Sequence, residues 1–321
     1  MNILEGYFRR AAAVLVVAAA TSLSSSARCE DFTIGVTIWD VSSTPAAVPI
    51  VRGMEKAAQA AGVKLIISDP HWDASAQTEN VREFVVQKVN AIAVFPIDAV
   101  GVTPAVREAE AAGIPVVAAL GVIEGIPYVG VDDVEYGRQS ARLMLDTLKQ
   151  AGDDKRRIVM FRGTAGGTPD RLRMQGITEV LKESGLKYDW VDVNADWSPD
   201  KALSGFQDVL QRFPAKGSIT AVTEMGNCMM PPALEWAKRS DRTEIKFFGV
   251  DLCKAEEEAI ASGDMVGSVY QDAAKMGALV VDTLVAMHKK GDFKTLPDFA
   301  QNPKIELCTH DAAANCKGRG F

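Results

Sequence analysis

The sequence predicts an α/β protein of two doubly wound lobes, each with a parallel β-sheet covered by helices on both faces. Two observations carry this prediction. Near-continuous apolar segments alternate with amphipathic segments along nearly the whole chain, which is typical of parallel sheets buried on both faces. The alternation also falls into two halves, and about 290 residues after a predicted leader are enough for two lobes.

In the first half, apolar runs predict strands at 32–38, 63–68, 91–95 and 114–119. Residues at helical spacing between them predict helices at about 45–61, 77–88 and 103–112. Glycines at the expected helix ends support these boundaries, because a left-handed glycine commonly follows the last helical residue. These glycines are Gly62, Gly113 and, in the second half, Gly185.

The second half repeats the alternation. Strands are predicted near 157–161, 188–193, 219–222 and 245–250, with helices such as 171–184 and 201–212 between them. Around Tyr128–Val131 and Val266–Tyr270 the pattern becomes short strands without long helices. We interpret these two segments as crossings between the lobes.

The first residues predict a cleavable secretory signal peptide at 1–27 and a periplasmic mature protein. Arg9 and Arg10 precede an apolar run at 11–20, and small residues lead up to Ala27. The alternative, a membrane anchor, needs about 20 apolar residues, and this run is shorter. A lipoprotein is disfavoured, because Arg28 directly precedes Cys29 where a small residue is expected.

Composition excludes one class of partner. Hydrophobic residues make up 47% of the chain and charged residues 24%, which is ordinary for a globular protein. The net charge of −7 argues against nucleic acid, since phosphate binding requires concentrated Lys and Arg.

An oxidising compartment favours paired cysteines. Cys308 and Cys316 bracket a short polar segment, and Cys228 and Cys253 both follow predicted strands. Either pairing is compatible with the sequence, neither follows from it, and Cys29 is left over. The competing interpretation is a metal site, but the spacings match no zinc pattern.

Ligands of open α/β sheets bind beyond the carboxyl ends of the strands, so the residues after each predicted strand form the candidate site. Two such edges that face each other enclose a cleft, which hinge closure shields from water. Indole rings can cover the apolar face of a sugar, while planar polar groups bond its hydroxyls. The candidate ligand-binding residues are Trp39, Ser43, Thr44, Arg173, Trp197, Asn227, Asp251 and Gln271.

Some of these candidates have a structural alternative. Trp39 could pack against the hinge. Ser43 and Thr44 could cap a helix, because Thr44–Pro45 suits an N-cap followed by a proline at the first helical position, as does Thr168–Pro169.

Catalytic and cofactor signatures are missing from the sequence. GTAGGT at 163–168 follows a strand, but it lacks the lysine and the glycine spacing of a phosphate-binding loop. HExxH and G-x-S-x-G motifs do not occur either. Asp251 is expected to hold the ligand, and the alternative role for this residue is that of a catalytic acid. We expect a protein that is not an enzyme and uses no cofactor or metal.

Several motifs together resemble the ribose- and galactose-type periplasmic solute-binding proteins of ABC transporters. They are SSTP at 42–45, AVREAEAAGIPVV at 105–117, GTPDRLRMQGI at 167–177 and FFGVD at 247–251, within a resemblance that spans 32–304. The resemblance implies a type I periplasmic-binding fold with three hinge crossings. Its N-terminal lobe would comprise residues 31–131 plus 272–297, and its C-terminal lobe residues 132–271 plus 298–321.

The resemblance also implies roles for single residues. Arg173 matches the ligand-binding arginine that stands three residues before the glycine of an R-x-x-G turn. Trp197 matches an aromatic residue that follows an aspartate, and Asp251 matches the acid that closes the G-x-D strand end. Gln271 matches the polar residue at the second crossing.

The first lobe departs from the family pattern. Leu120–Gly121 stands where sugar binders of this type usually have Asp-Arg, and Ala46–Ala47 stands where aromatic residues are frequent. In the second lobe, Gly226 occupies the position where the family usually has an amide side chain, and Asn227 follows one position later. The ligand is therefore expected to be a sugar, a polyol, a modified sugar or another small polar solute, held in an altered way with Trp39 in the first lobe.

The resemblance implies a monomeric substrate-binding component that delivers a small polar solute to an ABC permease in the inner membrane. The alternative function is a periplasmic sensor that presents its bound solute to a sensor kinase or chemoreceptor. That protein would share the cleft and differ on its outer surface.

Overall fold

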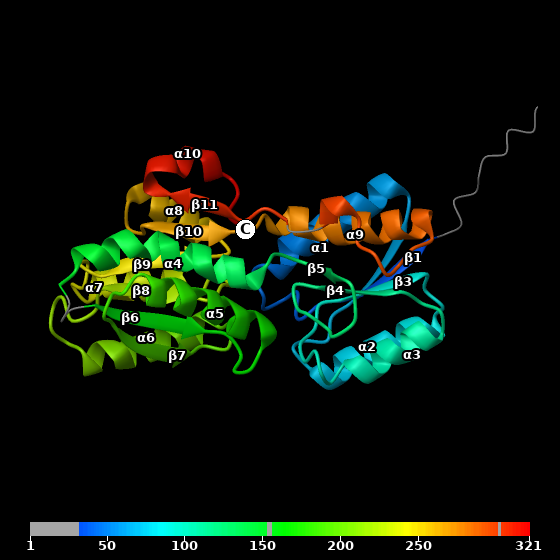
Figure 1. Ribbon diagram of the computed structural model, residues 1–321, viewed down its shortest axis with the longest axis horizontal. Helices are drawn as coiled ribbons and strands as arrows, with labels where there is room; N and C mark the ends of the chain where they lie inside the picture. The colour runs from blue at the N-terminus through cyan, green and yellow to red at the C-terminus, as the bar shows by residue number, and fades with distance from the viewer. Residues whose placement is uncertain (1–31, 153–155, 301–302) are drawn as a thin grey trace, which may run out of the picture. The chain divides into compact units, whose positions relative to one another are not determined.

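The computed structural model describes residues 32–152, 156–300 and 303–321, and it contains two β-sheets flanked by helices (Figure 1). The predicted signal peptide and Cys29 lie outside the described residues. Within the described residues, no helix combines the length and the apolar character needed to cross a membrane.

The first sheet has five parallel strands in the order β2-β1-β3-β4-β5. Its strands are β1 (Thr33–Thr37), β2 (Lys64–Ser68), β3 (Ala91–Val94), β4 (Val116–Ala119) and β5 (Tyr128–Val129). Helices pack in pairs against it, α1 with α9 and α2 with α3 (Figure 1). These helices are α1 (Ala47–Ala61), α2 (Ala74–Val86), α3 (Thr103–Ala111) and α9 (Ala273–Lys290).

The second sheet has six strands in the order β11-β10-β9-β8-β6-β7, and only β11 is antiparallel. Its strands are β6 (Arg157–Arg162), β7 (Asp189–Asn194), β8 (Ala221–Glu224), β9 (Lys246–Val250), β10 (Gly267–Tyr270) and β11 (Glu306–Thr309). Its helices are α4 (Asp133–Gln150), α5 (Thr168–Glu183), α6 (Pro199–Arg212), α7 (Met230–Arg239), α8 (Lys254–Ser262) and the short α10 (Ala313–Cys316). Short 3₁₀ turns occupy Asp298–Ala300 and His310–Ala312.

The predicted α/β architecture is therefore confirmed, and the buried strands explain why it could be predicted. Every residue of β3, β4 and β8 is buried, as expected for strands that are covered on both faces. Gly62, Gly113 and Gly185 all have positive φ angles within two residues after a helix end, as predicted.

Tyr128–Val131 and Val266–Tyr270 were predicted to be short strands at crossings between the lobes. Residues 128–129 and 267–270 form the strands β5 and β10, which pair into the sheets, and each strand is followed by a long helix, α4 and α9. The chain passes between the sheets directly after each of these strands and once more between α9 and β11. Three connections thus join the sheets, while the exact lobe boundaries stay a prediction.

The two Thr-Pro helix starts were wrong, by two residues for α1 and by one residue for α5. Helix α1 begins at Ala47, because Asp40 first organises a turn through its side chain and its carbonyl oxygen, which accepts from the amide of Thr44 at 3.2 Å. Helix α5 begins at Thr168 itself, with Gly167 in the capping position. Neither threonine side chain caps a helix.

Both predicted cysteine pairings form disulfides. One joins Cys228 to Cys253, and the other joins Cys308 on β11 to Cys316 on α10. The cysteines of each pair are bonded to each other, so they are not available as thiolate ligands of a metal.

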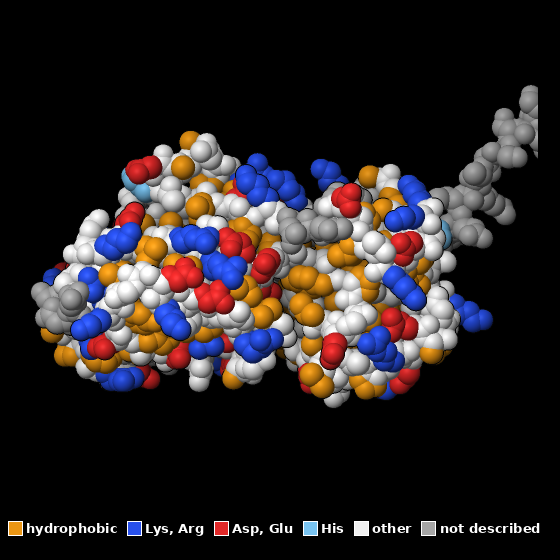
Figure 2. Space-filling model, viewed as in Figure 1, with side chains coloured by type: hydrophobic (Ala, Val, Ile, Leu, Met, Phe, Trp, Pro, Cys, Tyr) orange, Lys and Arg blue, Asp and Glu red, His pale blue; other side chains and the backbone are white. Residues whose placement is uncertain are grey.

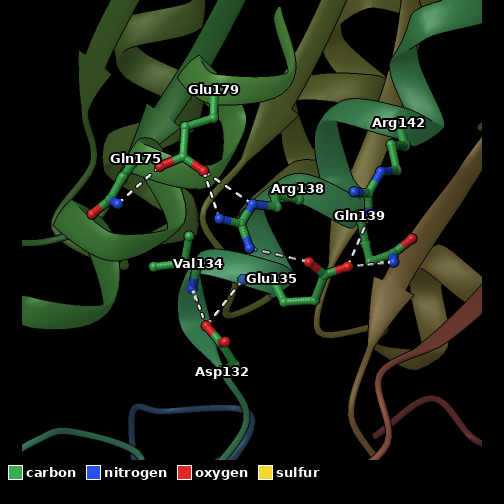
Figure 3. Close-up of polar contacts among 8 residues, drawn as sticks. All are labelled: Asp132, Val134, Glu135, Arg138, Gln139, Arg142, Gln175 and Glu179. Carbon is green, nitrogen blue, oxygen red and sulfur yellow. Dashed lines mark hydrogen bonds and ion pairs between the residues drawn. The ribbon is translucent and has the colours of Figure 1, made fainter. Parts of the chain in front are cut away.

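Helix α4 begins just after the first connection between the sheets and is tied to α5. Asp132 accepts hydrogen bonds from the amides of Val134 and Glu135, which caps the helix (Figure 3). Arg138 of α4 bridges Glu135 of its own helix and Glu179 of α5, at 2.7 Å for the latter contact (Figure 3). On the face visible in Figure 2, acidic and basic side chains are interspersed in the same manner.

Glycines set the spacing of two helix pairs. A Cβ atom on Gly277 of α9 would lie 1.9 Å from the carbonyl oxygen of Ile50 on α1, and one on Gly53 would lie 2.0 Å from that of Ala274. These helices pack backbone against backbone, which leaves no room for a side chain. Helices α4 and α5 are packed in the same way at Gly137 and Gly176.

We expect Gly277→Ala to lower the free energy of unfolding by about 1–3 kcal/mol, because the new methyl group must push α1 away from α9. Urea denaturation measures this change. The control is Gly205→Ala in α6, where the new Cβ meets only the side chain of Val193. An equal or smaller loss for Gly277→Ala than for Gly205→Ala would contradict this account of the helix pair.

Candidate functional site

A cavity of about 580 Å³ is lined by residues from both sheets, most of them just after the carboxyl ends of parallel strands. Its position follows from topology, because the loops that follow parallel strands gather at one edge of each sheet. Its volume falls within the range of small-molecule sites. This cavity is the candidate functional site.

Seven of the eight predicted site residues line this cavity: Trp39, Thr44, Arg173, Trp197, Asn227, Asp251 and Gln271. Ser43 does not line it. Its side chain is exposed, and its amide donates to the carboxylate of Asp40 at 3.0 Å. Burial acts to raise the pKa of Asp40, but hydrogen bonds from Ser42 and Ser43 outweigh it and lower that pKa to about 2.

A cluster of charged residues centred on Arg173 lies where the loops and helices of the second sheet line the cavity. Arg173 is 7% exposed; its Nε donates to Asp133 at 2.8 Å, and its Nη1 donates to the carbonyl oxygen of Met225. Nη1 also lies 3.7 Å from a carboxylate oxygen of Asp251, whose other oxygen accepts from the hydroxyl of Tyr136 at 2.8 Å. The guanidinium stacks over the Tyr136 ring at 4.5 Å.

The charges in this cluster depend on one another. Burial disfavours the charged form of Arg173, but the carboxylates of Asp251 and Asp133 outweigh it and raise the pKa of Arg173 above its ordinary value. Burial also raises the pKa of Asp133, against the opposing effect of Arg173. One cation thus compensates two carboxylates.

Two loops present the polar groups of the second-sheet side in a constrained backbone conformation. Asn227 has a φ of 63° and Asp251 a φ of 80°, both in the left-handed region. The amide of Asn227 donates to Asp251 at 3.1 Å, and its side-chain Nδ2 donates to the carbonyl oxygen of Trp197 at 2.7 Å. The Cys228–Cys253 disulfide joins the same two loops.

Two amide side chains in the cavity have a carbonyl oxygen that accepts no hydrogen bond from the described residues. The Asn227 Oδ1 and Gln271 Oε1 atoms are buried, with no hydrogen-bond partner among the described residues. Both residues are over nine-tenths buried and both line the cavity. A buried carbonyl oxygen without a partner costs free energy, which a donor on a bound molecule would remove.

Aromatic rings supply flat apolar surfaces in the cavity. Trp39 stacks on Trp72 with ring centroids 6.2 Å apart and meets the edge of Phe95 at 5.4 Å. On the other side, Trp197 lies over Gly163, where a Cβ atom would be 2.2 Å from the indole. Only glycine at position 163 leaves the indole this place in the cavity.

The part of the cavity contributed by the first sheet is mostly carbon, and we call it the first-sheet wall. It consists of Trp39, Thr44, Ala46, Ile50, Trp72, Pro96, Ile97, Asp98, Ala99, Val100, Leu120, Gly121 and Val122. Apart from the indole N–H groups, only Thr44 and Asp98 bring polar side-chain atoms to it. Thr44 Oγ1 already accepts from the Trp72 indole at 3.1 Å, and Asp98 accepts from two backbone amides of its own turn.

Sequence analysis missed three contributors. Trp72 follows β2 by four residues, so the rule of inspecting strand ends could have found it. Asp133 and Tyr136 lie in the first turns of α4, and no sequence signal connects them to Arg173 or Asp251, which are distant in the chain. The fold alone brings them together.

A second pair of buried acids supports the loop that carries Asp251. Glu224 ends β8 and accepts from the amide of Val250 at 3.1 Å, and Glu256 accepts from the hydroxyl of Ser268 at 3.0 Å. The two carboxyl groups are fully buried, and Glu224 Oε2 and Glu256 Oε1 have no hydrogen-bond partner among the described residues. Burial raises the pKa of both, that of Glu256 to about 7, so the pair holds a proton at neutral pH.

The ion cluster predicts unequal effects of removing its members. We expect Arg173→Met to lower the free energy of unfolding by about 3–5 kcal/mol, because two carboxylates remain buried without a counter-ion. Asp133→Asn should cost less, since Arg173 keeps Asp251 beside it. Urea denaturation at pH 7.5 compares the two variants, and equal losses would contradict the proposed charge balance.

The buried acid pair predicts a pH effect on stability. Between the pKa of an unfolded glutamate, about 4.3, and the raised native value, the native state binds more protons, so stability falls as pH rises. Glu256→Gln mimics the protonated acid, and its thermal midpoint should therefore fall less than that of the unmodified protein between pH 5 and pH 8. Calorimetry measures both, with the exposed Glu258→Gln on α8 as control. Parallel pH curves for all three proteins would refute the shared proton.

Comparison with known proteins assigns this architecture to a family. A family model described as periplasmic binding protein domain matches residues 34–292. The chain is 31% identical over 290 residues to a xylitol-binding protein of Mycolicibacterium smegmatis, covering 87% of this chain and 78% of that protein. It is 29% identical to the ribose import binding protein of Bacillus subtilis, covering 81% and 82% of the two chains.

Solved structures agree. An ABC transporter solute binding protein from Mycobacterium smegmatis with bound glycerol superimposes with a TM-score of 0.79 at 27% identity, over 89% of this chain and 97% of that one. The Caulobacter myo-inositol binding protein shares the fold, with a TM-score of 0.78 at 22% identity over 90% and 96% of the chains. The predicted resemblance and fold are confirmed, and the chain belongs to the periplasmic binding protein family.

Proposed function

We propose that this chain is the periplasmic substrate-binding component of an ABC importer for a sugar, a polyol or a similar small polar solute. The cavity carries the proposal, because it combines indole faces with planar polar groups at the carboxyl ends of both sheets. Relatives named for xylitol and ribose support the ligand class. Family membership supports the compartment and a permease of the inner membrane as partner.

In this proposal the indole rings of Trp39 and Trp197 cover the C–H faces of the solute. Arg173 donates to ligand oxygens, while Asp251 and the amides of Asn227 and Gln271 bond hydroxyl groups. Thr44 contributes its hydroxyl from the first-sheet side; it accepts from Trp72 and keeps its own proton to donate.

Binding without turnover fits the same residues. Among the described residues, those that line the cavity include no histidine, cysteine, lysine or glutamate, and Asp251 accepts hydrogen bonds from Tyr136 and Asn227. A protein of this kind releases its ligand unchanged, and we propose that it acts as a monomer without cofactor or metal. The predicted signal peptide at residues 1–27 would direct it to the periplasm.

Thermal unfolding in the presence of xylitol, D-ribose, D-allose, D-galactose and myo-inositol tests this function. A ligand at about 100 times its Kd stabilises the native state by about 2.7 kcal/mol, so at least one solute should raise the midpoint by several degrees. Absence of any shift would contradict the proposal, and product formation from a solute that binds would indicate an enzyme instead.

Site variants test the cavity assignment. We expect Trp197→Ala and Asp251→Asn to weaken the binding of an identified solute at least tenfold in calorimetric titration. Asp251→Asn leaves Arg173 paired with Asp133, so the fold should survive. Trp236→Ala is the matched control, because this tryptophan is 38% exposed on α7 and does not line the cavity. Equal affinities in all three variants would rule out the cavity as the binding site.

A further inference from the structure

The two sides of the cavity differ in how many hydrogen bonds they can offer to a bound ligand. The second-sheet side brings a guanidinium, a carboxylate and an amide through Arg173, Asp251 and Asn227, and Gln271 adds a second amide where the chain returns to the first sheet. On the first-sheet wall, Thr44 Oγ1 accepts from Trp72 and keeps its proton to donate, and Asp98 Oδ1 accepts from two amides of its own turn, while the other side chains end in carbon or an indole. A ligand hydroxyl directed at the carbon surface of that wall would lose its water without gaining a protein partner.

Two residues of the first-sheet wall, Leu120 and Trp72, have left-handed backbones, and Leu120 is the aliphatic one. It has a φ of 49°, in the left-handed region that a bulky residue rarely adopts. Its amide donates to the carbonyl oxygen of Val129 at 3.1 Å, which holds this conformation in place. An asparagine would adopt the same backbone with less strain, so the leucine carries a local conformational cost here. Strained positions of this kind concentrate at functional sites.

Exposed apolar side chains continue the same surface. Val100 is 83% exposed, and Val122 and Trp72 are each 37% exposed, although all three line the cavity. Contact between apolar surface and water costs free energy, and an apolar group that covers this surface removes that cost. A carbon group on the ligand would cover this area, whereas a hydroxyl would not.

We propose that the solute carries its hydrogen-bonding groups on one side and ends in a carbon without a hydroxyl on the other, as a deoxy sugar or a deoxy polyol does. The hydroxyl-bearing side lies against Arg173, Asp251 and Asn227, and the deoxygenated carbon lies against the first-sheet wall. Leu120 is the residue that determines this specificity. The inference rests on the proposed function and deepens it by naming the substrate class.

Calorimetric titration with matched pairs tests the ligand class. The pairs are xylitol with 1-deoxyxylitol, D-ribose with 5-deoxy-D-ribose, and D-galactose with 6-deoxy-D-galactose, and within each pair one terminal hydroxyl is missing. In at least one pair the deoxy compound should bind as tightly as its parent, within threefold, or more tightly. Deoxy compounds that are more than threefold weaker in every pair that binds would overturn the inference and leave the proposed function standing. Failure of all six compounds to bind would overturn both.

Leu120→Asn tests the residue. The substitution adds a hydrogen-bonding group to the first-sheet wall at a backbone angle that asparagine tolerates. It should shift the ratio of affinities at least tenfold toward the hydroxylated member of the pair that binds. The matched control is Leu307→Asn on β11, which is 47% exposed, lies outside the cavity and should leave the ratio unchanged.

Val122→Ser provides a second variant on the same wall and keeps the test decisive if Leu120→Asn fails to fold. It should shift the ratio in the same direction by a smaller factor. An unchanged ratio in every folded variant of the first-sheet wall would overturn the assignment of specificity to this surface.

Discussion

Arg173 carries a positive charge into the interior where α5 meets α4 and the loops after β8 and β9. It contacts Asp133 on α4, the carbonyl oxygen of Met225 after β8 and Asp251 after β9, and it stacks on Tyr136. A buried guanidinium is tolerated only when charge and hydrogen-bonding capacity are both compensated. Four segments are therefore held in a single arrangement, because displacing any one of them would leave the buried guanidinium without one of its partners.

The loops around Arg173 show how such an arrangement is maintained. Asn227 and Asp251 adopt left-handed backbone conformations that cost free energy in isolation. The disulfide between Cys228 and Cys253, the contact from the Asn227 amide to Asp251, and the acid pair beneath Asp251 all restrain these loops. A site held this way has its polar groups positioned before a ligand arrives, which lowers the conformational entropy that binding must overcome.

The first-sheet side of the cavity contacts a ligand mainly through apolar surface rather than through hydrogen bonds. Its contribution is aromatic and aliphatic surface, with the Trp39–Trp72 stack supported by the edge of Phe95. Contacts of this kind are non-directional, whereas the charged and amide groups of the second-sheet side demand defined partners in defined directions. Orientation of a bound solute is therefore set by one side of the cavity, and its apolar area is covered by the other.

Apolar periodicity and the strand-end rule are local patterns, so the sequence was enough to predict the α/β class, most of the strands, and eight candidate site residues, seven of which line the cavity. The sequence indicated short strands in Tyr128–Val131 and Val266–Tyr270, but not that residues 128–129 and 267–270 pair into the sheets with the crossings directly after them. It could not place Asp133 or Tyr136 beside Asp251 either, since Tyr136 and Asp251 are 115 residues apart. Contacts between distant segments depend on how helices pack, so the tertiary structure alone decided which carboxylates surround Arg173 and that Ser43 turns away from the cavity.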